Sequence, residues 1–271
     1  MPAPLSLLRD LAPLLRTDRF GRVQRGFETV GSTNTEAVQW ARAGAPEGAI
    51  VVAEHQTAGR GRLGRSWTDR SGQGLLFSVV LRPALPPERL SLVTLAGGVA
   101  VAEAVEAWTD PAEPRIKWPN DVLLGGRKCC GMLLESSLDA PRFVVLGIGL
   151  NVNQDAFPDA LADRATSLRL ETGRLIPRAA LLARLLERLE YWAGQLAAGN
   201  DAAVREAFTE RMTGRGTAVS VRLTQDGRAA RGVVEGIDAA GALCLRTETG
   251  TRVLHAGDVT FQSGHAHASA S

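Results

Sequence analysis

Four short apolar stretches follow one another between residues 115 and 151, separated only by turn residues. They cover residues 115–118, 122–124, 130–136 and 143–151. Parallel neighbours would need crossover connections of a dozen or more residues, and these connections are far shorter. This part of the chain is therefore expected to form a mostly antiparallel or mixed sheet, which excludes repeated strand–helix–strand units as the main architecture.

Longer segments on both sides predict the layers around this sheet. Buried strands are expected at residues 49–56 and 75–82, and apolar residues at helical spacing predict helices at residues 5–16, 33–43, 88–108, 178–198 and 202–212. From Gly214 the pattern changes to short alternating strands and turns, typical of a small meander or barrel. We therefore predict an α+β fold with a catalytic domain at 1–213, a small β-barrel domain at 214–262 and a disordered tail at 263–271.

Composition restricts the partners. The 271 residues are 45% hydrophobic with a net charge of +2, which gives no strong electrostatic footprint for nucleic acid or an anionic membrane. The longest apolar run, Ser91 to Ala102, is shorter than the roughly 18 residues of a membrane span, and the N-terminus lacks the pattern of a signal peptide. Three cysteines are too few for a disulfide framework, so a reduced, cytoplasmic setting is expected. The sequence leaves a monomer and a homodimer both open.

Lysine is almost absent from the chain. Of the 31 basic residues, 29 are Arg and only Lys117 and Lys128 are Lys. A compact ammonium differs from a planar guanidinium in shape and hydration, so each retained Lys marks a candidate functional position. The alternative is chance in a small sample.

A glycine-rich basic loop, Gly59-Arg60-Gly61-Arg62-Leu63-Gly64-Arg65-Ser66-Trp67, carries the strongest local signal. Its glycines allow close backbone approach to a ligand, its arginines can donate to phosphate, and Trp67 offers a stacking face. It matches neither a Walker loop nor a dinucleotide fingerprint. A solvated basic hairpin would account for the same residues if the loop stood alone, whereas a single-stranded nucleic-acid site would need more aromatic residues.

Two further segments have both a functional and an ordinary interpretation. Lys117-Trp118-Pro119-Asn120-Asp121 ends a strand and places polar groups for a ligand or a cation, but Asn and Asp after Pro are also common in turns. Lys128 follows Gly126-Arg127, where a hairpin tip is the commoner structure. Cys129 and Cys130 are interpreted as packing residues rather than nucleophiles.

Taken in order, five motifs resemble biotin protein ligase: GSTNTEA (31–37), EHQTAGRGRLGRSW (54–67), KWPNDV (117–122), GRKCCGMLLE (126–135) and GIGLNVN (147–153). The resemblance covers about residues 27–262. It implies a mixed sheet packed with helices, akin to class II aminoacyl-tRNA synthetases, and a small SH3-like β-barrel domain. It also implies that biotin and ATP react to give biotinyl-5′-AMP and pyrophosphate, after which biotin passes to a lysine of a biotin carboxyl carrier protein.

The resemblance also implies roles for residues on these motifs. It assigns biotin binding to Ser32, Thr33, Asn34, Gln56, Arg60, Gly61, Arg62, Lys128, Gly131 and Gly149. It assigns ATP binding to Arg60, Arg62, Trp67, Lys117, Asn120 and Asn151, with Trp67 against the adenine. Lys128, Arg60 and Asp121 are the implied catalytic residues, and Asp121 is the implied Mg²⁺ ligand or the base of the second step.

The resemblance leaves three questions of function. Some family members begin with a DNA-binding helix-turn-helix domain, and because only 30 residues precede Gly31, neither a repressor role nor nucleic-acid binding is expected. A lipoate or octanoate ligase or transferase is the nearest rival, although the polar Ser32-Thr33-Asn34 favours biotin over a fatty chain. A noncatalytic ligand-sensing or nucleic-acid module that uses the arginine loop is the alternative from another class.

Overall fold

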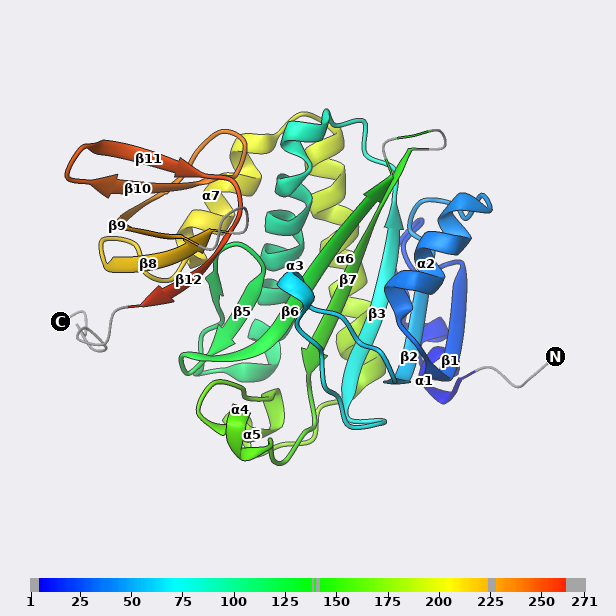
Figure 1. Cartoon of the computed structure of the whole chain (residues 1–271). Coiled ribbons are helices and arrows are strands. Elements are labelled where there is room, and N and C mark those ends of the chain that lie inside the picture. Colours follow the sequence, from blue (N-terminus) through cyan, green and yellow to red (C-terminus); the bar gives the residue numbers. More distant parts are fainter. Residues whose placement is uncertain (1–4, 138, 140–141, 224–227, 262–271) are drawn as a thin grey trace.

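A seven-stranded mixed sheet forms the centre of the molecule (Figure 1). The computed structural model describes residues 5–137, 139, 142–223 and 228–261. In the order β1-β2-β3-β7-β6-β5-β4, β1 and β2 pair in parallel and the other neighbours are antiparallel. The strands are β1 (Gln24–Val30), β2 (Ile50–Gln56), β3 (Gly74–Leu81), β4 (Arg115–Lys117), β5 (Asp121–Leu124), β6 (Arg127–Ser137) and β7 (Phe143–Asn151). The predicted mixed sheet is confirmed.

Helices cover both faces of the central strands, so β3 is buried at every position. On one face, Ala37 and Ala41 of α2 (Thr33–Arg42) pack against Val51 and Val80. The other face carries α3 (Ser91–Thr109), with α6 (Arg178–Ala197) packed on it (Figure 1). The remaining helices are α1 (Ser6–Leu11), α4 (Asp159–Ala162), α5 (Leu168–Thr172), α7 (Asp201–Arg211) and the 3₁₀ turns η1 (Ala12–Leu14), η2 (Arg62–Gly64) and η3 (Pro87–Arg89).

Small residues let α3 lie close to the sheet. A Cβ on Gly97 would come within 2.8 Å of Leu146 Cδ2, so only glycine fits there without displacing the strand's side chain. With η3, this helix is long and apolar enough by length and composition to cross a membrane, which the shorter run Ser91–Ala102 had not suggested. However, 67% of its apolar 18-residue stretch is buried inside the fold, where the helix is part of the core.

The C-terminal strands form a second, five-stranded antiparallel sheet in the order β11-β10-β9-β8-β12. They are β8 (Ala218–Leu223), β9 (Ala229–Ile237), β10 (Leu243–Thr247), β11 (Gly250–Leu254) and β12 (Gly257–Phe261). In the described part of the chain this sheet is open, with β11 and β12 at its edges, so the expected small β module is a meander with a returning strand. It contacts the first sheet where Trp118 Nε1 donates to Gly241 O at 3.0 Å.

The structure differs from the sequence-based expectation in two respects. Strand β1 was not predicted because its residues are only half-buried or exposed, so it has no apolar pattern. The short helices α4 and α5 also lacked a periodic signal. Ser32 occupies the N-cap position of α2, but its side chain makes no capping hydrogen bond. The tail at 263–271 lies outside the described residues.

Candidate active site

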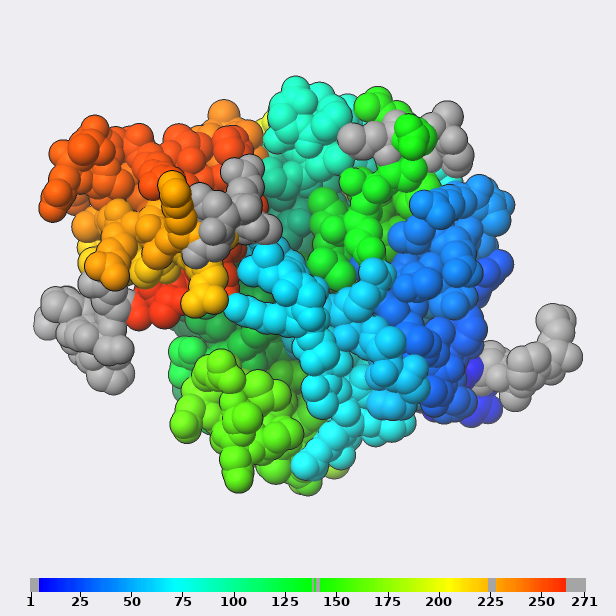
Figure 2. Space-filling view, viewed as in Figure 1, coloured from blue at the N-terminus to red at the C-terminus, as the bar shows by residue number. Residues whose placement is uncertain are grey.

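A cavity opens where the arginine loop crosses the central sheet, and residues from every predicted motif line it. In Figure 2 this loop, light blue to cyan, lies on the front face between α2 and the C-terminal sheet. The lining residues are Ser32, Thr33, Asn34, Gln56, Arg60, Gly61, Arg62, Leu63, Arg65, Ser66, Trp67, Asn120, Asp121, Lys128, Gly131, Met132, Leu133, Gly147, Ile148, Gly149 and Asp258. All predicted site residues except Lys117 and Asn151 therefore meet in one cavity.

Two paired glycines form the floor of the cavity under Trp67. Gly131 of β6 and Gly149 of β7 are register partners. A Cβ on Gly149 would lie 2.5 Å from Trp67 Cε2, and one on Gly131 would lie 3.0 Å from Trp67 Cζ3. The indole can therefore rest on the strands only because both positions lack a side chain. Its Nε1 is buried and has no hydrogen-bond partner among the described residues, so it retains a free donor.

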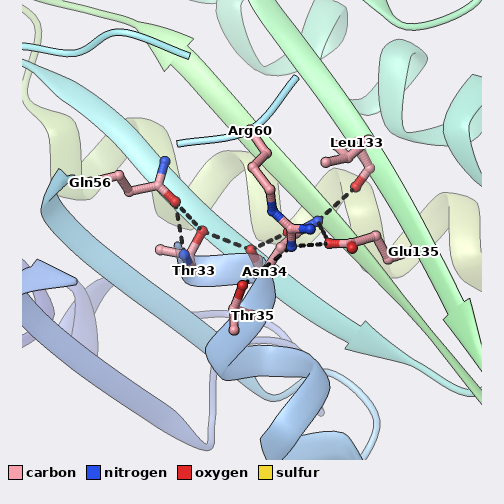
Figure 3. Close-up of polar contacts among 8 residues, drawn as sticks. Thr33, Asn34, Thr35, Gln56, Arg60, Leu133 and Glu135 are labelled. Carbon is pink, nitrogen blue, oxygen red and sulfur yellow. Dashed lines mark hydrogen bonds and ion pairs between the residues drawn. The ribbon is translucent and has the colours of Figure 1, made fainter. Parts of the chain in front are cut away.

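Polar side chains at the start of α2 form a buried network at one end of the cavity (Figure 3). Ser78 Oγ, on β3, lies 2.6 Å from Asn34 Oδ1 and 2.8 Å from Thr33 Oγ1. Gln56 Oε1 accepts from the backbone N–H of Thr33 at 2.8 Å. Gly147 makes room for this network, because a Cβ there would lie 2.0 Å from Asn34 Oδ1. These groups therefore hold one another in place by hydrogen bonds within the chain.

Arg60 reaches from the loop to this same end. Its Nη2 donates to Glu135 Oε2 at 2.9 Å and to Thr35 Oγ1 at 3.2 Å (Figure 3). Glu135 also accepts from Asn34 Nδ2 at 2.7 Å. One carboxylate on β6 thus joins the loop to the polar network.

Arg62 and Arg65 hold the loop at the opposite end. Arg62 Nη1 donates to Asn120 Oδ1 at 3.1 Å and to the backbone oxygen of Gly257 at 3.3 Å. Arg65 forms an ion pair with Asp258 on β12. Burial lowers the pKa of Arg62, an effect that the nearby carboxylates Asp121 and Asp258 oppose. The C-terminal sheet is therefore part of the wall of the cavity.

Lys128 projects from the start of β6 beside the glycine floor. Its Nζ lies 2.6 Å from Asp121 Oδ1 and 5.7 Å from the centre of the Trp67 ring. The backbone of Lys128 is fixed as well, because its N–H donates to Arg164 O at 2.8 Å. An ammonium held between a carboxylate and an aromatic face can bind an anionic ligand.

Comparison with known proteins agrees with this geometry. The model of the Biotin/lipoate A/B protein ligase family matches residues 26–153, and that of the Biotin protein ligase C terminal domain matches residues 219–261. The Bifunctional ligase/repressor BirA of Bacillus spizizenii is 36% identical over 90% of this chain and 76% of its own length. The chain belongs to the biotin protein ligase family.

Another relative and a solved structure are also similar to this member of the biotin protein ligase family. The Biotin–[acetyl-CoA-carboxylase] ligase of Mycobacterium tuberculosis is 39% identical over 84% of this chain and 85% of its own length. A solved structure of the biotin protein ligase from Aquifex aeolicus, in complex with biotin and ATP, superposes with a TM-score of 0.78. It is 30% identical and covers 89% of this chain and 99% of that chain. The fold predicted from the motifs is confirmed.

Two predicted ATP-binding residues lie outside the cavity of this family member. Lys117 Nζ lies 5.9 Å from the centre of the Phe261 ring and does not line the cavity. Asn151 is 4% exposed, and its amide is used internally: Nδ2 donates to Thr166 O at 3.0 Å, and Oδ1 accepts from Gln154 at 3.3 Å. Asn151 thus ties β7 to the segment before α5, and in this conformation neither side chain is placed to contact a ligand in the cavity.

Three residues that line the cavity or hydrogen-bond to its lining were not singled out from the sequence. Ser78 lies in a strand that reads as uniformly apolar, and its hydroxyl is completely buried. Glu135 ends the quoted motif GRKCCGMLLE, where a lone acid after apolar residues was the available signal. Asp258 belongs to the C-terminal segment, and nothing in its local sequence indicates that Arg65 lies beside it.

The two adjacent cysteines pack in the core, as predicted. Cys129 and Cys130 are both fully buried. Burial raises the pKa of Cys129 to about 12 and that of Cys130 well above its ordinary value. Both therefore stay protonated thiols at neutral pH, unsuited to nucleophilic chemistry.

Proposed function

We propose that this protein activates biotin with ATP and transfers it to a lysine of a biotin carboxyl carrier protein. The observation that carries the proposal is a single cavity in which a preformed polar network faces one end and Lys128, Arg62 and Asn120 lie at the other. Such a cavity suits a ligand with a polar ring and a carboxylate that must meet a triphosphate. The Aquifex relative was solved with biotin and ATP, which supports the same pair of substrates here.

In the first step, a carboxylate oxygen of biotin attacks the α-phosphorus of ATP. The new C–O–P bond forms while the bond to the bridging oxygen breaks, and pyrophosphate leaves with the electron pair. Because two anions approach each other, fixed cations in a pocket with little water must offset their repulsion. We assign this role to Lys128, at the carboxylate, and to Arg62, whose guanidinium lies beside Asn120.

Magnesium would enter with the triphosphate. Among the described residues, no group of three or more His, Cys, Asp or Glu side chains could hold a metal ion alone. Asp121, with Asn120 next to it, supplies the one or two oxygen ligands that Mg²⁺ usually takes from a protein when phosphates and waters supply the rest. The donor set therefore fits, and bound Mg²⁺ would offset negative charge on the phosphates.

In the second step, the ε-amine of the carrier lysine attacks the carbonyl carbon of biotinyl-5′-AMP. The amide bond forms, the carbonyl–oxygen bond breaks and AMP leaves. The attacking amine must lose a proton, and Asp121 is the carboxylate of the cavity placed nearest to Lys128. We assign Asp121 to orienting that amine or accepting its proton.

The state of the cysteines bears on the cellular setting. All three cysteines of the chain are unpaired. We therefore assign the protein to the cytoplasm, where thiols stay reduced.

A lipoate or octanoate ligase is the alternative that the family description leaves open. A fatty chain would need an apolar slot, whereas Thr33, Asn34 and Ser78 fill the corresponding end with hydrogen-bonding groups. A methylene chain would displace water from this polar end and make no hydrogen bond to it, which is unfavourable. Biotin, whose ring system donates and accepts hydrogen bonds, fits this end better.

The proposal is tested by incubating the protein with ATP, Mg²⁺ and biotin, lipoate or octanoate in turn. We expect pyrophosphate release with biotin, and covalent biotin on a purified carrier domain when that domain is added. Tighter binding of lipoate than of biotin would overturn the substrate assignment. An absence of pyrophosphate release with all three acids would leave a noncatalytic binding module.

A further inference from the structure

Arg60 and Arg62 stand only two residues apart, yet their guanidinium groups lie at opposite ends of the cavity. Arg62 contacts Asn120 and Gly257 at the end assigned to the nucleotide. Arg60 instead crosses toward the first turn of α2 and the middle of β6. The two arginines therefore have different neighbours to act on, although the sequence motif presents them as equivalent phosphate ligands.

The partner of Arg60 has two roles at once. Glu135 Oε2 accepts from Arg60 Nη2 at 2.9 Å and from Asn34 Nδ2 at 2.7 Å. The second hydrogen of that amide points to Leu133 O at 3.3 Å, and Asn34 Oδ1 accepts from Ser78. Asn34 is thus held in one orientation, and the loop is fastened to the same carboxylate (Figure 3).

We propose that Glu135 is a positioning residue that clasps Arg60 over the biotin end of the cavity and so sets how long activated biotin is retained. The proposal rests on the function proposed above. The side chain of Arg60 is 46% exposed and that of Glu135 is 29% exposed, so the pair lies at the rim, where it closes the cavity without sealing it. An ion pair at this depth contributes little to overall stability.

The clasp has a specific consequence for the reaction. Once biotin is adenylated, the product must stay bound until a carrier arrives, although the loop must open to admit substrates. A rim contact that forms between loop and strand slows escape without contributing to the bond-making step. Loss of the clasp should therefore raise the dissociation rates of biotin and biotinyl-5′-AMP much more than it changes the rate of pyrophosphate release.

Glu135→Gln separates the two contacts of the carboxylate. The amide oxygen of Gln can still accept from Asn34, but the charge that holds Arg60 is removed. We expect the dissociation rates of labelled biotin and of biotinyl-5′-AMP to rise about tenfold, while pyrophosphate release in a single turnover at saturating substrates stays within twofold. Glu135→Ala should also raise the KM for biotin, because Asn34 then loses its partner.

Glu187→Gln is the matched control. Glu187 accepts from Arg184 at 3.0 Å on α6, and the exposures of that pair, 23% and 48%, resemble those of Glu135 and Arg60. This variant should leave both rates unchanged. If Glu135 acts through Arg60, Arg60→Gln should raise the dissociation rates similarly, and adding Glu135→Gln to Arg60→Gln should have little further effect.

Dissociation rates unchanged by Glu135→Gln, or effects of the two substitutions that simply multiply, would overturn the clasp. A fall in pyrophosphate release with unchanged dissociation would also overturn it, since Glu135 would then act on the chemical step. The proposed function is judged separately, by pyrophosphate release from the unaltered protein. Because release of labelled biotin can be followed without ATP, the clasp is tested even if no adenylation occurs.

Discussion

The Nζ atom of Lys128 lies 2.6 Å from Oδ1 of Asp121, across the point where β5 and β6 shift register. The shift brings the two side chains to the same side of the sheet, beside Gly131. In this partly buried position each side chain offsets the charge of the other. Under the function proposed above, a biotin carboxylate at Lys128 would share it with Asp121, and the carrier amine would later approach the same Asp121 carboxylate.

Lys128→Arg should slow pyrophosphate release in a single turnover about 100-fold, as loss of one charge-stabilising donor commonly does. The ammonium lies directly beside Gly131, since a Cβ there would be 2.8 Å from both Cε and Nζ of Lys128. A planar guanidinium spreads its charge over a rigid fork and cannot reproduce a compact ammonium at that point. The reverse exchange Arg184→Lys, on α6, should have no effect. Equal rates for the two variants would show that charge alone suffices.

Gly147→Ala should reduce kcat/KM for biotin about 100-fold, because displacement of a positioning group by about 1 Å can have that effect. The new methyl would overlap Asn34 Oδ1 and push the amide away from Ser78. Gly194→Ala in α6 is the control, since nothing lies within 4 Å of its Cβ. That change should leave kinetics intact and stabilise the helix by about 0.5–1 kcal/mol. Similar kinetics for both variants would contradict the assigned role of Gly147.

Asp258→Asn should loosen the arginine loop from the C-terminal sheet. The substitution removes the charge that holds Arg65. The contact of Arg62 with Gly257 O at 3.3 Å then remains as a link between the loop and the C-terminal sheet. We expect faster hydrogen exchange over residues 59–67 and a higher KM for ATP, with KM for biotin nearly unchanged. Binding of biotinyl-5′-AMP should protect the same residues in the unaltered protein. Exchange that neither the variant nor the ligand changes would show that the loop is fixed by other contacts.

The sequence was most informative where function requires rare residues. Glycine cannot be replaced at Gly131 or Gly149 because Trp67 lies against the strands, and the scarcity of Lys marked Lys128 correctly as a cavity residue. The long helices and the buried strands were equally visible, because burial imposes periods that a sequence displays, whereas the half-buried or exposed β1 was not. The helices, the buried strands and the unusual Lys128 could be predicted from the sequence alone, whereas Gly131 and Gly149 were assigned by the resemblance to the family.

The remainder depends on contacts between distant segments. Glu135 and Arg60 are 75 residues apart, and Asp258 and Arg65 are 193 residues apart, so only the fold brings each pair together. Lys117 shows that a rare residue need not line the cavity. The scarcity of Lys suggested a functional position, but the Lys117 ammonium lies beside the Phe261 ring and is not part of the cavity lining. Motif spacing identifies which residues are unusual, whereas their partners are set by strand order and register.

Native alkylation at pH 8 should modify one thiol quickly and leave two unreacted. Burial raises the pKa of all three thiols, but Cys244 is partly exposed, whereas Cys129 and Cys130 are fully buried. Mass spectrometry after a short treatment with iodoacetamide should show a single adduct on Cys244, and all three sites should react in urea. Cys244→Ser should then give no rapid adduct. Prompt modification of Cys129 in the native protein would contradict the buried arrangement.

The Cys129 thiol should also make stability fall at high pH. Burial raises its pKa in the folded protein to about 12, whereas the unfolded chain releases the proton near the ordinary value of about 8.5. Because the unfolded state binds fewer protons between these values, the contribution is complete below pH 8.5 and is lost as the pH rises toward 12. Urea unfolding should therefore show that the stability difference between the unaltered protein and Cys129→Ala shrinks by about 2 kcal/mol from pH 7.5 to pH 10. A difference that stays constant over that range would show that Cys129 ionises equally in both states, and Cys244→Ala, at the partly exposed thiol, should show the smaller change.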